Sequence, residues 1–144
     1  DFWTVRMKPG KPLAFGTMVT AEAKKERKVP HLGLPGNPVS SMITFEQFAR
    51  PAILKMLGYD NLAKPAVRAT IDRDIPNRDG RRVFVRVIVT ERSGQYYASL
   101  TGPQGSGILT SMVKANGLAV IRENQKLVSA GDTVDVQMLD WRQE

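Results

Sequence analysis

The stretch "GLPGNPVSSMITFEQFARPAILKMLG", residues 33–58, decides how the first part of the chain folds. Apolar residues recur in it at intervals of three and four positions, which predicts an amphipathic helix. They are Val39, Met42, Phe45, Phe48, Ala49, Ala52, Ile53 and Met56. Asn37 is a good N-cap residue, and Pro38 suits the first helical position. We therefore expect a helix that begins at Pro38.

Two further residues of this stretch shape the helix. Gly58 follows the last apolar residue and predicts its C-terminal end. Pro51 lies inside the pattern and lacks a backbone N–H, so the helix should kink near Gln47 or split there.

Three apolar segments before the helix predict strands. They are "FWTVRM" (2–7), "LAFGTMVTA" (13–21) and "VPHLGL" (29–34). Between the last two lies "EAKKERK" (22–28), whose mixed charges indicate a solvated hairpin tip rather than a nucleic-acid patch. Strands followed by a covering helix are typical of the end of an α/β layer.

Beyond a hinge-like segment, "GYDNLAKP" (58–65), the hydrophobic period becomes two. Segments 66–75, 81–91, 95–100, 117–124 and 132–139 predict short strands. Short strands at close spacing, separated by Gly and Asn turns, indicate a small β-barrel or sandwich.

One segment, "SGILTSMVKANG" (106–117), interrupts this pattern. Ser106 is a residue type that caps helices. We expect it to begin a short helix that carries Leu109, Met112 and Val113 on one face.

The composition excludes several classes of function. Of 144 residues none is cysteine and one is histidine, which rules out disulfides and thiolate metal sites and disfavours a zinc centre or a Ser/His/Asp hydrolase. No apolar run approaches the roughly 20 residues that cross a bilayer, so we expect no membrane association and a cytoplasmic protein. The net charge of +7 predicts an anionic partner.

Two stiff loops concentrate that charge. In "MKPGKPLAFG" (7–16), prolines fix the backbone around Lys8 and Lys11, which then present positive charge to an oxyanion. In "GLPGNPVSS" (33–41), glycines and the helix start offer backbone N–H groups to an anion. The alternatives are two solvated lysines and a simply capped helix. Sequential strands usually lie side by side, so both loops could line one sheet edge.

These two loops also resemble those of the molybdopterin molybdotransferase family, of the MoeA and gephyrin E-domain type. "GRRVFVRV" and "SGILTSMVKANGLAVI" are similar to segments of that family's C-terminal β-barrel. The resemblance extends over nearly the whole chain. It implies residues 1–62 as the C-terminal part of a three-layer α/β (MogA-like) molybdopterin-binding domain, and residues 63–144 as the small β-barrel domain, together the C-terminal third of a longer protein.

The resemblance implies an activity and a set of site residues. Family enzymes hydrolyse adenylated molybdopterin, release AMP and insert molybdate into the dithiolene, whose thiolates belong to the substrate. Lys8 and Lys11 would be the catalytic residues and would bind molybdate or the pterin phosphate. The remaining binding residues would be Pro12, Gly36, Asn37, Ser40, Arg86 and Ser106. Such a set suits a tetrahedral dianion, which is best held by several converging donors.

The same resemblance implies a Mg²⁺ cofactor whose carboxylate ligands lie upstream, so we expect no metal ligand within this chain and no activity from this chain alone. It also implies a homodimer for the full-length protein, with small anionic molecules as partners and no nucleic acid. The rival hypothesis is a nucleic-acid-binding module built on a basic β-barrel. A scaffolding role, as in gephyrin-type relatives, is a third class that no residue here favours.

Overall fold

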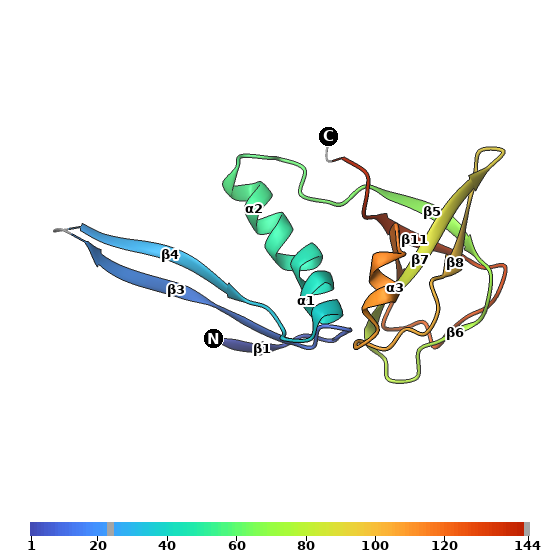
Figure 1. The fold of residues 1–144 in the computed structure, drawn as a ribbon, viewed down its shortest axis with the longest axis horizontal. Coiled ribbons are helices and arrows are strands. Elements are labelled where there is room, and N and C mark those ends of the chain that lie inside the picture. The colour runs from blue at the N-terminus through green and yellow to red at the C-terminus, as the bar shows by residue number, and fades with distance from the viewer. Residues whose placement is uncertain (23–24, 143–144) are drawn as a thin grey trace.

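The computed structural model describes residues 1–22 and 25–142. Figure 1 shows an elongated arrangement in which a long β-hairpin points away from the rest, a helix stands in the middle, and a β-barrel lies at the other end. Within the described ranges, no helix is both long and apolar enough to cross a membrane.

A three-stranded antiparallel sheet forms the first part, in the order β1-β3-β4. β1 spans Phe2–Thr4, β3 spans Pro12–Glu22 and β4 spans Lys25–Gly33. The strand predicted for 2–7 is therefore shorter, because the chain leaves this sheet after Thr4. Its next two residues of strand, Met7–Lys8 (β2), pair instead with the barrel.

The hairpin tip predicted for residues 22–28 is shorter than predicted, because β3 runs as far as Glu22. β4 already begins at Lys25, and Arg27 and Lys28 lie opposite Thr20 and Val19. Residues 23 and 24 are outside the described part. The charged side chains misled the interpretation because backbone pairing in a hairpin does not depend on side-chain polarity, and exposed side chains stay in solvent.

The predicted helix is confirmed as three consecutive segments: α1 (Pro38–Thr44), a π-helical turn (Phe45–Ala49) and α2 (Arg50–Met56). The Asn37 side chain accepts a hydrogen bond from the Ser40 backbone N–H at 3.4 Å, as a cap does. The expected disturbance before Pro51 takes the form of the π-helical turn, in which the Arg50 N–H bonds to the Phe45 carbonyl five residues back. Gly58 follows with φ +85°.

Five strands close into the small barrel that the alternating pattern predicts. They are β5 (Ala66–Ile71), β7 (Arg82–Arg92), β8 (Gln95–Leu100), β9 (Gly117–Ile121) and β11 (Thr133–Met138). The ring runs β7-β8-β5-β11-β9 and closes through the β9–β7 pairing. A short pair, β6 (Ile75–Pro76) with β10 (Leu127–Val128), was not predicted, because two-residue strands carry no period.

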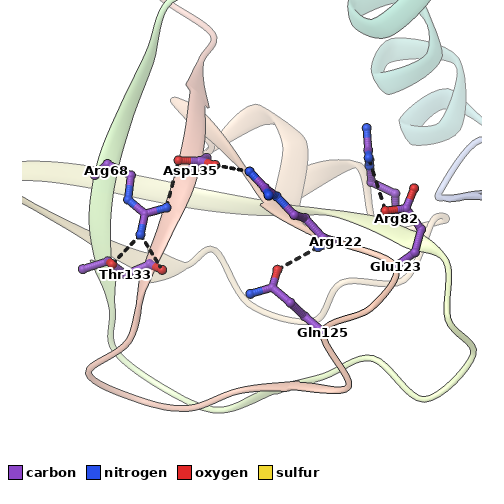
Figure 2. Close-up of polar contacts among 7 residues, drawn as sticks. All are labelled: Arg68, Arg82, Arg122, Glu123, Gln125, Thr133 and Asp135. Atoms are coloured by element: carbon purple, nitrogen blue, oxygen red, sulfur yellow. Dashed lines mark hydrogen bonds and ion pairs between the residues drawn. The ribbon is translucent and has the colours of Figure 1, made fainter.

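Exposed ion pairs link neighbouring strands on one side of the barrel (Figure 2). Asp135 on β11 pairs with Arg68 on β5 at 3.0 Å and with Arg122, just after β9, at 3.4 Å. Arg82 at the start of β7 pairs with Glu123 at 3.2 Å. The two arginines favour the ionised carboxylate and hold the pKa of Asp135 below its usual value.

The short helix α3 spans Leu109–Val113, but its N-cap residue is Ile108, and no side chain caps it. The prediction that Ser106 caps this helix was therefore wrong. The three apolar residues predicted to share a face of this helix differ in burial: Met112 is buried, whereas Leu109 and Val113 are exposed. A helix of five residues is little longer than one turn, so only part of its circumference reaches the core.

A common apolar cluster joins the two parts of the chain. It consists of Met7, Val39, Ile43, Phe84, Met112 and Leu118, all of them buried. The segment predicted as a hinge is also fastened to the helix, because the Lys64 ammonium contacts the Glu46 carboxylate at 2.7 Å. Nearby, the Gln47 amide donates to the Gln137 side chain at 2.7 Å. The helix and the barrel are thus held against each other by packing.

Candidate functional site

A cleft of about 370 Å³ lies where β2 meets the barrel. Its lining combines apolar residues of β6 and β7 with a small set of polar groups: Lys8, Asp74, Arg86, Gln104 and the Gly105 backbone. Two of these side chains are cationic and one is anionic. The cleft therefore carries a net positive charge, which suits an anionic guest.

Arg86 is the most unusual residue of the cleft. Its side chain projects from β7 and is 1% exposed. Nε donates to the Ser111 hydroxyl at 3.1 Å, and Nη2 donates to the Gly105 carbonyl at 3.2 Å. Among the described residues no carboxylate pairs with this guanidinium, and burial lowers its pKa. A buried cation without a counter-ion is costly, and a bound anion would offset that cost.

The backbone of Arg86 is held as firmly as its side chain. The Gln104 side chain accepts from the Arg86 N–H at 2.8 Å and donates to the Arg86 carbonyl at 3.2 Å, as a neighbouring strand would. The same carbonyl accepts from the Thr101 N–H at 3.2 Å. Segment 101–111 thus wraps around Arg86 and fixes its place in the cleft wall.

Lys8 reaches the cleft from the first of the two predicted loops. The loop is anchored by Gly10, which is buried with φ +100°. A Cβ atom there would lie 2.5 Å from the Thr44 hydroxyl and 3.7 Å from the Ser40 carbonyl. The loop therefore packs directly against α1, the helix that the second loop begins. Proximity of Lys8 also contributes, after Arg81, to lowering the pKa of Asp79.

The structure brings together only part of the predicted set. Lys8 and Arg86 line the cleft, whereas the remaining predicted residues, all within the described part of the chain, do not: Lys11, Pro12, Gly36, Asn37, Ser40 and Ser106. Lys11 is exposed on the same loop as Lys8, and Ser106 is exposed beside the lining residue Gly105. Their roles stay predictions.

The second loop, residues 33–41, does not need the glycine that its predicted anion-binding role relied on. Gly36 has open space around its Cβ position and no left-handed φ, so the loop does not need glycine there. Asn37 and Ser40 are used in capping α1, and Ser40 is buried. The simpler alternative, a well-capped helix start, accounts for these contacts.

Gln104 and Ser111 are site residues that the sequence interpretation missed. Both lie in "GPQGSGILTS", the segment that contains Ser106, which the family resemblance had singled out. Ser111 is 1% exposed, but its burial becomes visible only in the fold, so no signal in the sequence pointed to either residue.

The aromatic residues that a nucleic-acid-binding barrel would use are engaged within the chain. Tyr96 packs edge-on against Trp141 with ring centroids 6.2 Å apart, and the Arg92 guanidinium lies 4.3 Å above the Tyr97 ring. In the described residues no group of three or more His, Asp or Glu side chains is arranged to hold a metal ion. The implied Mg²⁺ therefore has no fitting ligand set among the described residues.

Comparison with known proteins defines the class of each part. Residues 68–139 match the family described as the MoeA C-terminal region (domain IV), and residues 1–55 match the probable molybdopterin binding domain. The first match covers half of the chain, and the chain belongs to the MoeA C-terminal family.

Relatives of the whole chain agree with this assignment. A molybdopterin molybdenumtransferase from Haemophilus influenzae is 35% identical over 139 residues, covering 95% of this chain and 32% of that protein. The molybdenum cofactor synthesis protein cinnamon from Drosophila melanogaster is 36% identical over 142 residues, covering 94% and 22%. The chain thus spans about a third or less of the length of these relatives, and nothing among them supports the nucleic-acid hypothesis.

Solved structures confirm the predicted fold class. The molybdopterin biosynthesis moeA protein from Pyrococcus horikoshii OT3 superimposes with a TM-score of 0.72 at 27% identity, covering 95% of this chain and 31% of that one. The fold is the end of an α/β molybdopterin-binding domain followed by a small β-barrel. The residue at which one domain gives way to the other stays a prediction, since β2 pairs with the barrel from within the first 62 residues.

Proposed function

We propose that this chain is the C-terminal third of a molybdopterin molybdotransferase and that its cleft binds the molybdate used in molybdenum cofactor biosynthesis. The observation that carries the proposal is the Arg86 guanidinium, which is buried without a carboxylate partner in the described chain and lines the same cleft as Lys8. The names of the relatives support the choice of substrate.

The chemistry asked of these residues is binding and charge neutralisation. Molybdate is a tetrahedral dianion, and a guanidinium and an ammonium in the same cleft would neutralise its two charges. The apolar lining residues exclude part of the surrounding water, which strengthens both interactions. Asp74 also lines the cleft, and its carboxylate accepts a hydrogen bond from the Ala130 N–H at 2.8 Å, which limits its rotation.

Lys11 has a separate part in the proposal. It is exposed outside the cleft but three residues from Lys8 on the same anchored loop. We assign Lys8 to the molybdate and Lys11 to the phosphate of the pterin substrate. In the full-length protein, which we propose to be a cytoplasmic homodimer as the family resemblance implies, the upstream part would complete the site. The lack of cysteine is in keeping with a reducing compartment.

Tungstate or molybdate binding to the chain, followed by calorimetry, tests the proposal. Replacing Lys8 by Ala or Arg86 by Met should weaken binding by about 1 to 3 kcal/mol each, the scale of a charge-assisted hydrogen bond. Lys126→Ala removes an exposed lysine that does not line the cleft and is the matched control. Equal affinity in all three variants would contradict the assignment of the cleft.

A further inference from the structure

We propose that Ser111 is a positioning residue for Arg86: its hydroxyl fixes the plane of the guanidinium so that the unpartnered edge faces the cleft. This inference rests on the proposed function for its consequence, anion binding. Its structural content, the orientation of Arg86, can be tested without any ligand.

The orientation of the Arg86 guanidinium follows from where the Ser111 hydroxyl donates its single proton. It donates to the Ile108 carbonyl at 2.6 Å, one helical turn back. Because the proton is committed there, only lone pairs are left to face Arg86, and the hydroxyl accepts from Nε at 3.1 Å. Ser111 thus acts toward the guanidinium purely as an acceptor.

A second acceptor completes the alignment. The Gly105 carbonyl receives Nη2 at 3.2 Å, so two neighbouring nitrogens of one planar group are tied to separate segments of the chain. Two such bonds define the plane of a guanidinium. Nη1 has no hydrogen-bond partner in the described chain, and Arg86 lines the cleft. In this proposal Nη1 is the donor that a guest in the cleft would meet.

Ser111 is itself held on three sides. Its backbone N–H donates to the Ile108 carbonyl at 3.1 Å, and its carbonyl accepts from the Thr101 hydroxyl at 2.8 Å. The next residue, Met112, is buried in the apolar cluster shared with α1. The acceptor for Nε is therefore fixed by both the loop and the shared core, which is what a preorganised anion site requires.

A serine in this place has a simpler explanation, namely that it satisfies a buried arginine and has no bearing on binding. The two explanations differ in one respect. If Ser111 acts only on stability, its replacement changes the anion affinity by the same amount, which can be zero, whether or not Arg86 is present. If it positions Arg86, the effect on binding vanishes once the guanidinium is gone.

Nuclear magnetic resonance of the Arg86 Nε–H group in the whole chain tests the orientation directly. The wild-type chain should show a slowly exchanging Nε–H signal, assigned by its loss in Arg86→Met. Ser111→Ala should broaden or remove that signal, Ser111→Thr, which keeps the hydroxyl, should retain it, and Thr110→Ala, an exposed hydroxyl on the same helix, is the control. Absence of a protected signal in the wild type overturns the proposal even if Ser111→Ala does not fold, and so does an unchanged signal in a folded Ser111→Ala.

Tungstate affinity in a double-mutant cycle tests the consequence. Ser111→Ala should weaken binding about tenfold in the Arg86 background, the scale of one hydrogen bond, and have no effect in Arg86→Met. An equal loss in both backgrounds overturns the positioning role. If the wild type binds no tungstate while Ser111→Ala still abolishes the Nε–H signal, the proposed function fails and the positioning of Arg86 stands.

Discussion

Replacing Gly10 by Ala tests whether the loop that carries Lys8 and Lys11 packs against α1. Two costs add at this position. The backbone has φ +100°, where an L-residue is strained by about 1 to 3 kcal/mol. The new Cβ would also lie 2.5 Å from the Thr44 hydroxyl and 3.0 Å from the Met7 methyl carbon, an overpacking that costs about 1 to 3 kcal/mol.

The free energy of unfolding of Gly10→Ala should therefore fall by about 2 to 6 kcal/mol in urea denaturation, without a change in the m-value. Thr44 is fully buried, so its side chain has little room to move away. Its hydroxyl has no hydrogen-bond partner among the described residues. Thr44→Ala removes the hydroxyl oxygen that the new Cβ would meet. The double variant should regain the steric part of the loss but not the backbone part.

Gly36→Ala is the matched control, because that glycine has open space around it and no left-handed φ. Its stability should stay within about 0.5 kcal/mol of the wild type. If Gly10→Ala is as stable as Gly36→Ala, or if Thr44→Ala fails to relieve it, then the loop does not pack on α1 as described, and the placement of Lys8 loses its support.

Two further changes have defined outcomes. Asn37→Ala removes the cap of α1 and should lower the free energy of unfolding by about 0.5 to 1 kcal/mol in urea, because the 3.4 Å bond to Ser40 is long; no change would mean that the cap contributes nothing. Asp135→Asn should flatten the dependence of the free energy of unfolding on pH in acid. Arg68 and Arg122 lower the pKa of Asp135 in the folded state, below the usual value of 3.8. The ionised carboxylate therefore stabilises the fold above pH 3.8, and this stabilisation is lost as the pH falls below that value. This exposed carboxylate contributes less than about 1 kcal/mol, and an identical pH profile in thermal melts of the variant would refute the role of the pair.

The barrel strands could be predicted because each buries alternate residues, as Val134, Val136 and Met138 do. The helix could be predicted from its start at Asn37 and Pro38 and from its apolar spacing. The buried face itself differs from that spacing: the buried Ile43 was not in the predicted pattern, and four large apolar residues of the pattern are exposed, namely Met42, Phe45, Ile53 and Met56. The length of the β3–β4 hairpin could not be predicted this way. Residues 17–20 and 26–31 are exposed, so charged residues fit there as well as apolar ones and leave no period.

Residues that line the cleft could be predicted only where they belong to a recognisable sequence motif. Lys8 stands in a stiff basic loop, and Arg86 came from the family resemblance. Nothing local marks Gln104 or Ser111 as partners of Arg86, because they lie 18 and 25 residues away along the chain and meet it only in the folded state. Lys11 and Gly36 stand in equally suggestive local sequence but do not line the cleft, and their predicted roles stay predictions.

The apolar cluster that spans Met7, Ile43 and Phe84 has a consequence for how such a barrel can be inherited. A recombination event that transplanted only the barrel onto another protein would carry Arg86 but leave behind Lys8 and three of the six cluster residues, Met7, Val39 and Ile43. The barrel and the preceding helix are therefore a single unit of exchange, and substitutions in one will be tolerated chiefly when the other changes to fit.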